Sequence, residues 1–203
     1  MFEKKYIPKL YKEMVDRKYF DESSDEYIWM YECEWLSEED VYEYEYEDSE
    51  SRDVLPFALT GHGDKWGFVN NGSDEPYIGI CYAEDTQGTY YAKNFEDAII
   101  RNIIEFVSSS YFYIDEDEAE SYEISGEELE EYLEQWINAF KGILKQDYID
   151  LLNALKGMKL KKCSDDYCEW YALLTVEEAR DLVRQYCGFE LLDKEFEWYE
   201  LTQ

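Results

Sequence analysis

The side chains best suited to catalysis are the single histidine, His62, and five cysteines. His62 lies between two glycines in the segment Gly61-His62-Gly63-Asp64. With only one histidine, multi-histidine metal sites are excluded, and any nucleophilic triad would depend wholly on this residue. His62 could be paired with Asp64 and Cys81, but flanking glycines are typical of a turn. We therefore interpret His62 as a turn residue and expect no catalytic residues.

The cysteines are Cys33, Cys81, Cys163, Cys168 and Cys187. Cys163 and Cys168 are separated by four residues, and no second pair of ligands follows at zinc-site spacing. They could approach each other across a hairpin and oxidise, but we expect both to be core thiols. The N-terminal residues have no apolar leader segment, and no run of about 18 apolar residues occurs. We expect a cytoplasmic protein with reduced thiols and no membrane segment.

Acidic residues are too frequent for their spacing to identify a site. The chain has 50 Asp and Glu among 203 residues, so any pair spacing suited to acid–base or Mg²⁺ chemistry arises by chance. Asp115-Glu116-Asp117-Glu118 could bind Ca²⁺, but it lacks the EF-hand spacing and glycine. Gly61 and Gly63 open no phosphate loop. We expect no metal and no cofactor.

The net charge of −31 is the strongest feature of the composition, with 45% apolar and 18% aromatic residues. So many aromatic residues indicate a folded protein rather than a disordered polyanion. Residues 21–53 contain fifteen acids and one base, and residues 102–140 contain twelve acids and no base. Such a charge repels nucleic acid and attracts basic proteins, although it could serve solubility alone. The lysine cluster between Lys141 and Lys162 could pair with acids of the same chain.

The candidate partner-binding residues are tyrosines and acids in two segments. Tyrosine offers a large contact area at low entropic cost, and carboxylates bind Arg and Lys of a basic partner. The alternative is that the tyrosines line the core while the glutamates face water. The candidates are Tyr42, Glu43, Tyr44, Glu45, Tyr46 and Glu47, followed by Asp115, Glu116 and Asp117.

The first half of the chain predicts an α+β domain. A short helix is expected over 8–18 and strands over 27–36, 54–59, 66–69, 77–82 and 89–92. Pro56 suits an edge strand or a strand start. Ser37 resembles the cap of a short helix, whereas the alternation over 42–47 favours a strand, and the sequence leaves this open. Asn94 caps a helix that carries Phe95, Ile99, Ile103 and Phe106 at helical spacing.

The second half predicts helices and one hairpin. Ser125 with Glu128 forms a capping box before an apolar stripe from Leu129 to Leu144, and a shorter helix ends at Gly157. The ranges 158–163 and 167–174 form a hairpin, a last helix is capped by Thr175, and 189–201 is expected to be extended. We predict an α+β domain over 1–110 and a helix-rich α+β extension over 111–203, and the sequence leaves open whether the two pack as one unit.

The segment Val54-Leu55-Pro56-Phe57-Ala58, followed by Gly61-His62-Gly63-Asp64-Lys65-Trp66-Gly67-Phe68, resembles the SUKH superfamily. This superfamily includes cell-wall-synthesis regulators and bacterial toxin-immunity proteins. The strands over 77–82 and 89–92 and the helix start at Asn94 follow the family order, so the resemblance covers about residues 27–107. The matching motif residues, for which a structural role is expected, are Leu55, Pro56, Phe57, Gly61, Gly63, Asp64 and Trp66.

The resemblance implies a mostly antiparallel sheet with packed helices and no catalytic residues. Together with the charge, it leads us to expect an immunity protein that neutralises a basic toxin, for example a nuclease. A regulatory scaffold and an acidic mimic of nucleic acid are the alternatives. We expect a basic protein partner, and neither nucleic acid nor a membrane.

Overall fold

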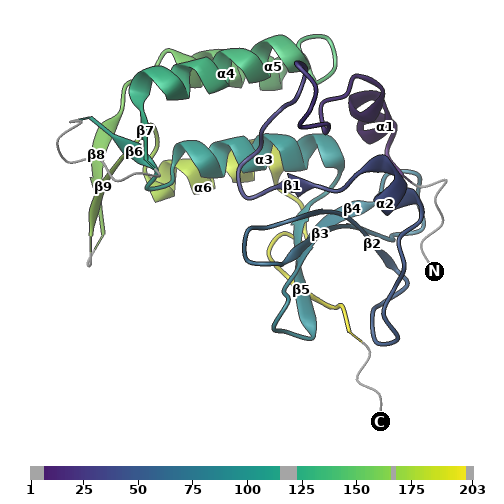
Figure 1. The fold of residues 1–203 in the computed structure, drawn as a ribbon. Coiled ribbons are helices and arrows are strands. Elements are labelled where there is room, and N and C mark those ends of the chain that lie inside the picture. The colour runs from purple at the N-terminus through teal and green to yellow at the C-terminus, as the bar shows by residue number, and fades with distance from the viewer. Residues whose placement is uncertain (1–6, 115–122, 166–167, 200–203) are drawn as a thin grey trace. The chain divides into compact units, whose positions relative to one another are not determined.

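The computed structural model describes residues 7–114, 123–165 and 168–199 (Figure 1). The protein has an α+β fold, as predicted, with two sheets. The chain forms two compact units, one from Met1–Ile99 with Cys187–Gln203 and one from Ile100–Tyr186. The segment Glu195–Glu197 pairs with a strand of the first sheet, and the predicted domain division at residues 110/111 stays a prediction.

The first unit contains a six-stranded antiparallel sheet in the order β1-β2-β3-β4-β5-β10. Its strands are β1 (Glu34–Trp35), β2 (Val54–Leu59), β3 (Lys65–Val69), β4 (Tyr77–Cys81), β5 (Gln87–Ala92) and β10 (Glu195–Glu197). The strand expected over 27–36 is limited to β1, and the extended segment expected over 189–201 contains only the short β10. The other four predicted strands are confirmed as β2, β3, β4 and β5.

Pro56 lies inside the sheet, because β2 has neighbours on both sides. Proline donates no backbone hydrogen bond, so it is found mainly at edges or bulges. Here β1 pairs only with Ala58 and Leu59, and the β2–β3 register shifts between Pro56 and Ala58. The bulge thus explains how a strand that contains Pro56, for which an edge position or a strand start was expected, occupies an inner position.

One face of this sheet carries an aromatic core. Tyr11, from α1 (Lys9–Asp16), is fully buried and packs edge-to-face on Phe68 and Phe95 at centroid distances of 5.2 and 5.6 Å. Phe57 stacks on Phe68 at 4.5 Å. Phe95 opens α3 (Phe95–Val107), whose predicted cap is confirmed by the hydrogen bond from the Asp97 amide to Asn94 Oδ1. Packing of this kind stabilises beyond the area that is buried.

The opposite face is covered by the C-terminal segment. Trp198 is buried against Val54, Val69 and Cys81. Phe196 approaches Gly79 and Gly88 so closely that a Cβ at either glycine would lie 2.7 Å from its ring. The two glycines therefore make room for the ring of β10, which pairs Phe196 with Gly88.

The motif residues of the family resemblance lie in β2, in β3 and in the turn between them. Leu55, Phe57 and Trp66 are buried, and the Trp66 indole donates to the carbonyl of Glu32 at 2.7 Å. Gly63 has a φ of +87°, which suits glycine. Gly61 has no positive φ. Asp64 Oδ1 accepts from the Ala83 amide at 3.0 Å and so joins two turns that are distant in sequence.

The second unit contains helices around a four-stranded sheet in the order β7-β6-β9-β8. Its strands are β6 (Phe112–Tyr113), β7 (Ile124–Ser125), β8 (Lys161–Ser164) and β9 (Glu169–Ala172), and its complete helices are α4 (Gly126–Phe140) and α5 (Gln146–Lys156). The helix α6 spans Val176–Cys187. The capping box of Ser125 with Glu128 and the hairpin β8–β9 are confirmed.

The core of this unit lies beneath α4. Trp136 and Phe140 are fully buried. The ring of Phe106 packs edge-to-face on Trp136 and Phe112, with centroid distances of 5.7 and 5.2 Å. Leu152, from α5, is also fully buried. In Figure 1, α4 and α5 lie side by side, as expected for two amphipathic helices joined by a short connection.

Candidate binding surface and its buried support

The tyrosine–glutamate segment 42–47 is not a strand. Ser37 caps the short helix α2 (Glu38–Tyr42) by accepting from the Asp40 amide, and the following residues are irregular. Tyr42, Tyr44 and Tyr46 are nevertheless half-buried. Glu43, Glu45 and Glu47 are exposed. The carboxylates of this segment therefore face solvent, whereas its tyrosine rings are partly buried. We call residues 42–47 the Tyr–Glu strip.

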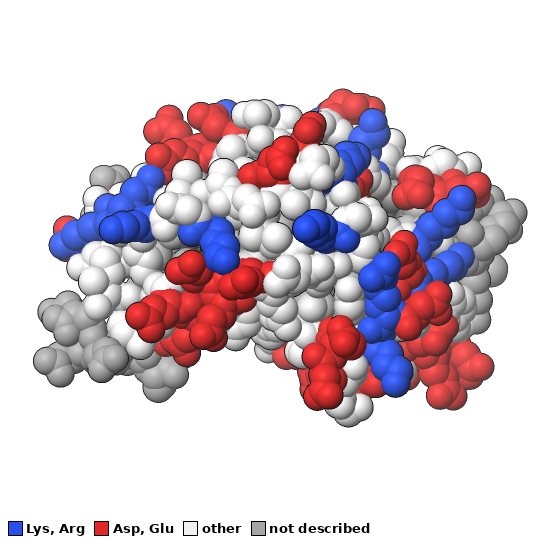
Figure 2. All heavy atoms as spheres, turned by 90° about the horizontal axis from the view of Figure 1, so that it is seen from above, with Lys and Arg blue, Asp and Glu red and all other residues white. Residues whose placement is uncertain are grey.

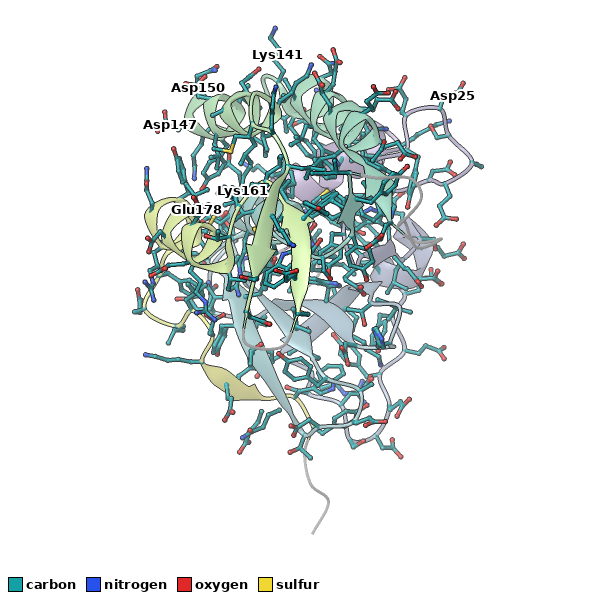
Figure 3. All side chains as sticks on the ribbon, turned by 90° about the vertical axis from the view of Figure 1, so that its left-hand side faces the viewer. Asp25, Lys141, Asp147, Asp150, Lys161 and Glu178 are labelled. Atoms are coloured by element: carbon teal, nitrogen blue, oxygen red, sulfur yellow. The ribbon has the colours of Figure 1, made fainter. Side chains whose placement is uncertain are left out.

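The acids around the strip are also exposed, with two exceptions. Between Asp21 and Asp53 only Glu32 and Glu50 are not exposed. Asp25, labelled in Figure 3, lies on the loop after α1 and projects into solvent. This region of the first unit is therefore a strongly acidic surface.

Glu50 forms a buried ion pair with Lys65. The Glu50 side chain is 0% exposed and the Lys65 side chain 23% exposed, with 2.5 Å between Nζ and Oε1. The Glu47 amide and the Tyr44 hydroxyl also donate to Glu50, at 3.0 Å and 3.1 Å. A buried carboxylate is tolerated only when it is paired and hydrogen-bonded, and Glu50 meets both conditions.

This network connects the Tyr–Glu strip to the sheet and to the C-terminal segment. Lys65 Nζ donates to the Tyr44 hydroxyl at 2.9 Å and lies 5.3 Å from the centroid of the Trp198 ring. The Ser51 amide donates to the Trp198 carbonyl at 2.8 Å. Side-chain networks of this kind fix one arrangement, so the strip is held in place although it is irregular.

The electrostatics of the network favour a charged lysine. Burial opposes the ammonium form and is the largest single effect, but hydrogen bonds to Glu50 and Tyr44 outweigh it and raise the pKa of Lys65 above its ordinary value. Burial also raises the pKa of the Cys81 thiol, so Cys81 is not a thiolate at neutral pH. The cluster therefore has the character of a structural ion pair.

Alkaline pH is expected to destabilise the fold through Tyr46. Burial, followed by the nearby Tyr44, raises the pKa of Tyr46 from 10.0 to about 12. Because the unfolded chain loses this proton first, the contribution to stability is complete below pH 10 and is lost as the pH rises to about 12. Urea unfolding across this range should show a smaller decline in the Tyr46→Phe variant than in the wild type. Equal declines would contradict a role for Tyr46.

The structure does not assemble a nucleophilic site around His62. His62 is exposed in the turn that Thr60 closes, where the Gly63 amide donates to the Thr60 carbonyl at 2.9 Å. Cys81 is fully buried, and the Asp64 carboxylate accepts from Ala83. No group of three or more His, Cys, Asp or Glu side chains in the described ranges could hold a metal ion.

The cysteines are free, and four of them, Cys33, Cys81, Cys163 and Cys187, are buried. The expectation that Cys168 is a core thiol is wrong, because it is exposed next to the hairpin turn. Cys163 lies opposite Trp170 in the β8–β9 register rather than opposite Cys168. The hairpin therefore does not place the two thiols opposite each other.

The lysine cluster pairs in part with acids of the same unit, as the sequence suggested. Lys156 pairs with Glu134 at 3.1 Å and Lys162 with Glu169 at 2.7 Å, and Lys161 pairs with Glu178. The hydrogen bond from Lys161, together with that from the Thr175 amide, lowers the pKa of Glu178 to about 2. Lys161 and Glu178 are labelled in Figure 3, and Figure 2 shows basic side chains beside acidic ones. These lysines do not form a free cationic surface.

Asp115, Glu116 and Asp117 lie outside the described residues. Glu50 and Lys65 were not among the predicted site residues, since Glu50 is one of fifteen acids in its region and nothing in its local sequence marks it as buried. Lys65 could have been noticed as a base that follows an acidic run, but its partner could not.

Within the described residues no helix is long and apolar enough to cross a membrane. A scan against protein-family models, a search of curated proteins and a search of solved structures each found no match.

Proposed function

We propose that this chain is a non-catalytic binding protein of the immunity type, which neutralises a basic toxin by covering it with an acidic surface. The observation that carries the proposal is the exposed carboxylate surface of residues 21–53, in which the Tyr–Glu strip is held by the buried pair of Glu50 and Lys65. The net charge of −31 and the resemblance to the SUKH superfamily support it.

The recognition chemistry follows from the strip itself. Glu43, Glu45 and Glu47 can accept charge-assisted hydrogen bonds from Arg and Lys of the partner. The half-buried rings of Tyr44 and Tyr46 contact each other, with 5.0 Å between their centroids. Because this contact already restricts their rotamers in the free protein, little side-chain entropy is lost on binding. A nuclease needs a basic surface for its phosphate substrate, and an acidic protein that occupies this surface excludes the substrate.

The proposal is tested with the basic product of a reading frame adjacent to the gene of this chain. Co-expression should restore growth that the product alone inhibits, and calorimetric titration should show binding that weakens as salt is raised. The Glu43→Gln/Glu45→Gln/Glu47→Gln variant should weaken binding at low salt by at least about tenfold, because charge pairs that face the partner are lost.

The matched control is the Asp74→Asn/Glu75→Gln/Glu84→Gln variant, which removes the same number of exposed charges from the first unit outside residues 21–53. It should change the Kd by no more than about threefold, since long-range attraction is screened within about 10 Å at 0.1 M salt. Absent or salt-independent binding would contradict the proposal. Competition with DNA for several unrelated basic proteins would favour a mimic of nucleic acid instead.

A further inference from the structure

The second unit has an open groove of about 550 Å³ between the first half of α4 and the connection from α5 to β8. Its lining includes the buried Leu129, Leu133, Leu155 and Leu173. Ile114 and Met158 also line it, and they are 58% and 46% exposed. We call this the α4 groove. Its volume falls in the range of about 300–1,000 Å³ that is typical of binding pockets.

The exposed apolar side chains of the groove are unusual for this protein. Only four large apolar side chains in the described parts of the chain are exposed, the other two being Tyr82 and Val176. Two of the four therefore lie together at one hollow, which four buried leucines also line. Exposed apolar patches next to charged residues are characteristic of interaction sites.

The charged residues that line the groove are two glutamates and two lysines, and the glutamates come from α4. Glu127 and Glu130 of α4 line it, and α4 has five glutamates and no basic residue. On the opposite wall Lys156 is paired with Glu134, whereas Lys159 is exposed. At the first turn of α4 the Glu128 amide donates to Ser125 Oγ, and the Ser125 amide donates to the Glu128 carboxylate. The α4 side thus favours a cationic ligand.

We propose that the α4 groove binds an amphipathic basic segment of the partner protein, with apolar side chains in the groove and Lys or Arg against the glutamates of α4. A groove with two exposed apolar side chains, Ile114 and Met158, next to the glutamates of α4 matches the mode in which an amphipathic helix lays its apolar face into a groove. The inference rests on the proposed function, because it assigns a second contact to the same basic partner.

The experiment uses the full chain with ¹³C-methyl-labelled methionine and two synthetic peptides. One peptide has lysines with leucines at positions i, i+3, i+4 and i+7, and the other has serine in place of each leucine. Met158 is 46% exposed, whereas Met14 and Met30 are buried in the first unit and serve as internal references. The leucine peptide should shift the Met158 methyl signal, and the serine peptide should not.

Three variants distinguish binding in the groove from general electrostatic attraction of a basic peptide to the acidic protein. Met158→Ser and Ile114→Ser should each weaken binding of the leucine peptide by about tenfold, because each removes apolar contact area. Val176→Ser is the matched control, since Val176 is 43% exposed and does not line the groove. It should leave the affinity unchanged.

The inference would be overturned if both peptides bound equally, or if the Met158 signal stayed in place while the peptides bound. It would also be overturned if Val176→Ser weakened binding as much as Met158→Ser. These outcomes concern the second unit only. Titration of the basic partner with the Tyr–Glu strip variants is a separate measurement, so the proposed function can stand when the groove assignment fails.

Discussion

Replacement of Lys65 by methionine should lower the free energy of unfolding by about 3–5 kcal/mol, because it leaves a buried carboxylate without its counter-ion. The Glu50 side chain is 0% exposed, so water cannot replace the lost partner. The hydrogen bonds from Tyr44 and the Glu47 amide remain, but they supply no compensating charge. Equilibrium urea unfolding followed by circular dichroism measures the change.

Two further variants define the cause of the loss. Lys65→Met combined with Glu50→Gln should recover a substantial part of the stability, since no unpaired charge remains and the amide oxygen still accepts hydrogen bonds. Lys161→Met breaks the exposed pair with Glu178 and should cost less than about 1 kcal/mol. If Lys65→Met were as mild as Lys161→Met, the ion pair would not support the Tyr–Glu strip.

Replacement of Trp198 by alanine should also cost about 3–5 kcal/mol, as is typical when a large buried ring is removed. Trp198 is 1% exposed and closes the cluster formed with Val54, Val69 and Cys81. Its backbone hydrogen bonds to Thr86 and Ser51 do not depend on the side chain, so the variant isolates the packing of the ring. The measurement is again urea unfolding.

The control for Trp198 is Glu197→Ala, which changes the neighbouring exposed side chain of β10 and should stay within about 0.5 kcal/mol. Because Lys65 Nζ lies 5.3 Å from the Trp198 ring centroid, Trp198→Ala and Lys65→Met should not be additive. A small effect of Trp198→Ala would mean that the C-terminal segment does not complete the first unit.

Local features of the chain could be predicted because their causes are local. Asn94, Ser125 and Thr175 begin helices through bonds to amides three residues away, and all three caps are present. The hairpin β8–β9 is likewise formed by neighbouring segments. The Tyr–Glu strip shows the limit of such reasoning. The tyrosines of the strip are half-buried and its glutamates are exposed, so the alternation of the sequence appears in the burial of the side chains. The segment is nevertheless not a strand, because a strand needs a hydrogen-bonded partner and no described strand pairs with residues 42–47.

Composition, caps and periodicity are sufficient to predict an acidic, aromatic-rich α+β protein and most of its helices and hairpins. The pairing of β10 with β5, the burial of Glu50 against Lys65, and the shared groove of Ile114 and Met158 become visible only in the folded chain. The physical reason is that caps and periodicity act between residues a few positions apart. The burial of one particular acid, by contrast, depends on which distant segments the folded chain brings against it.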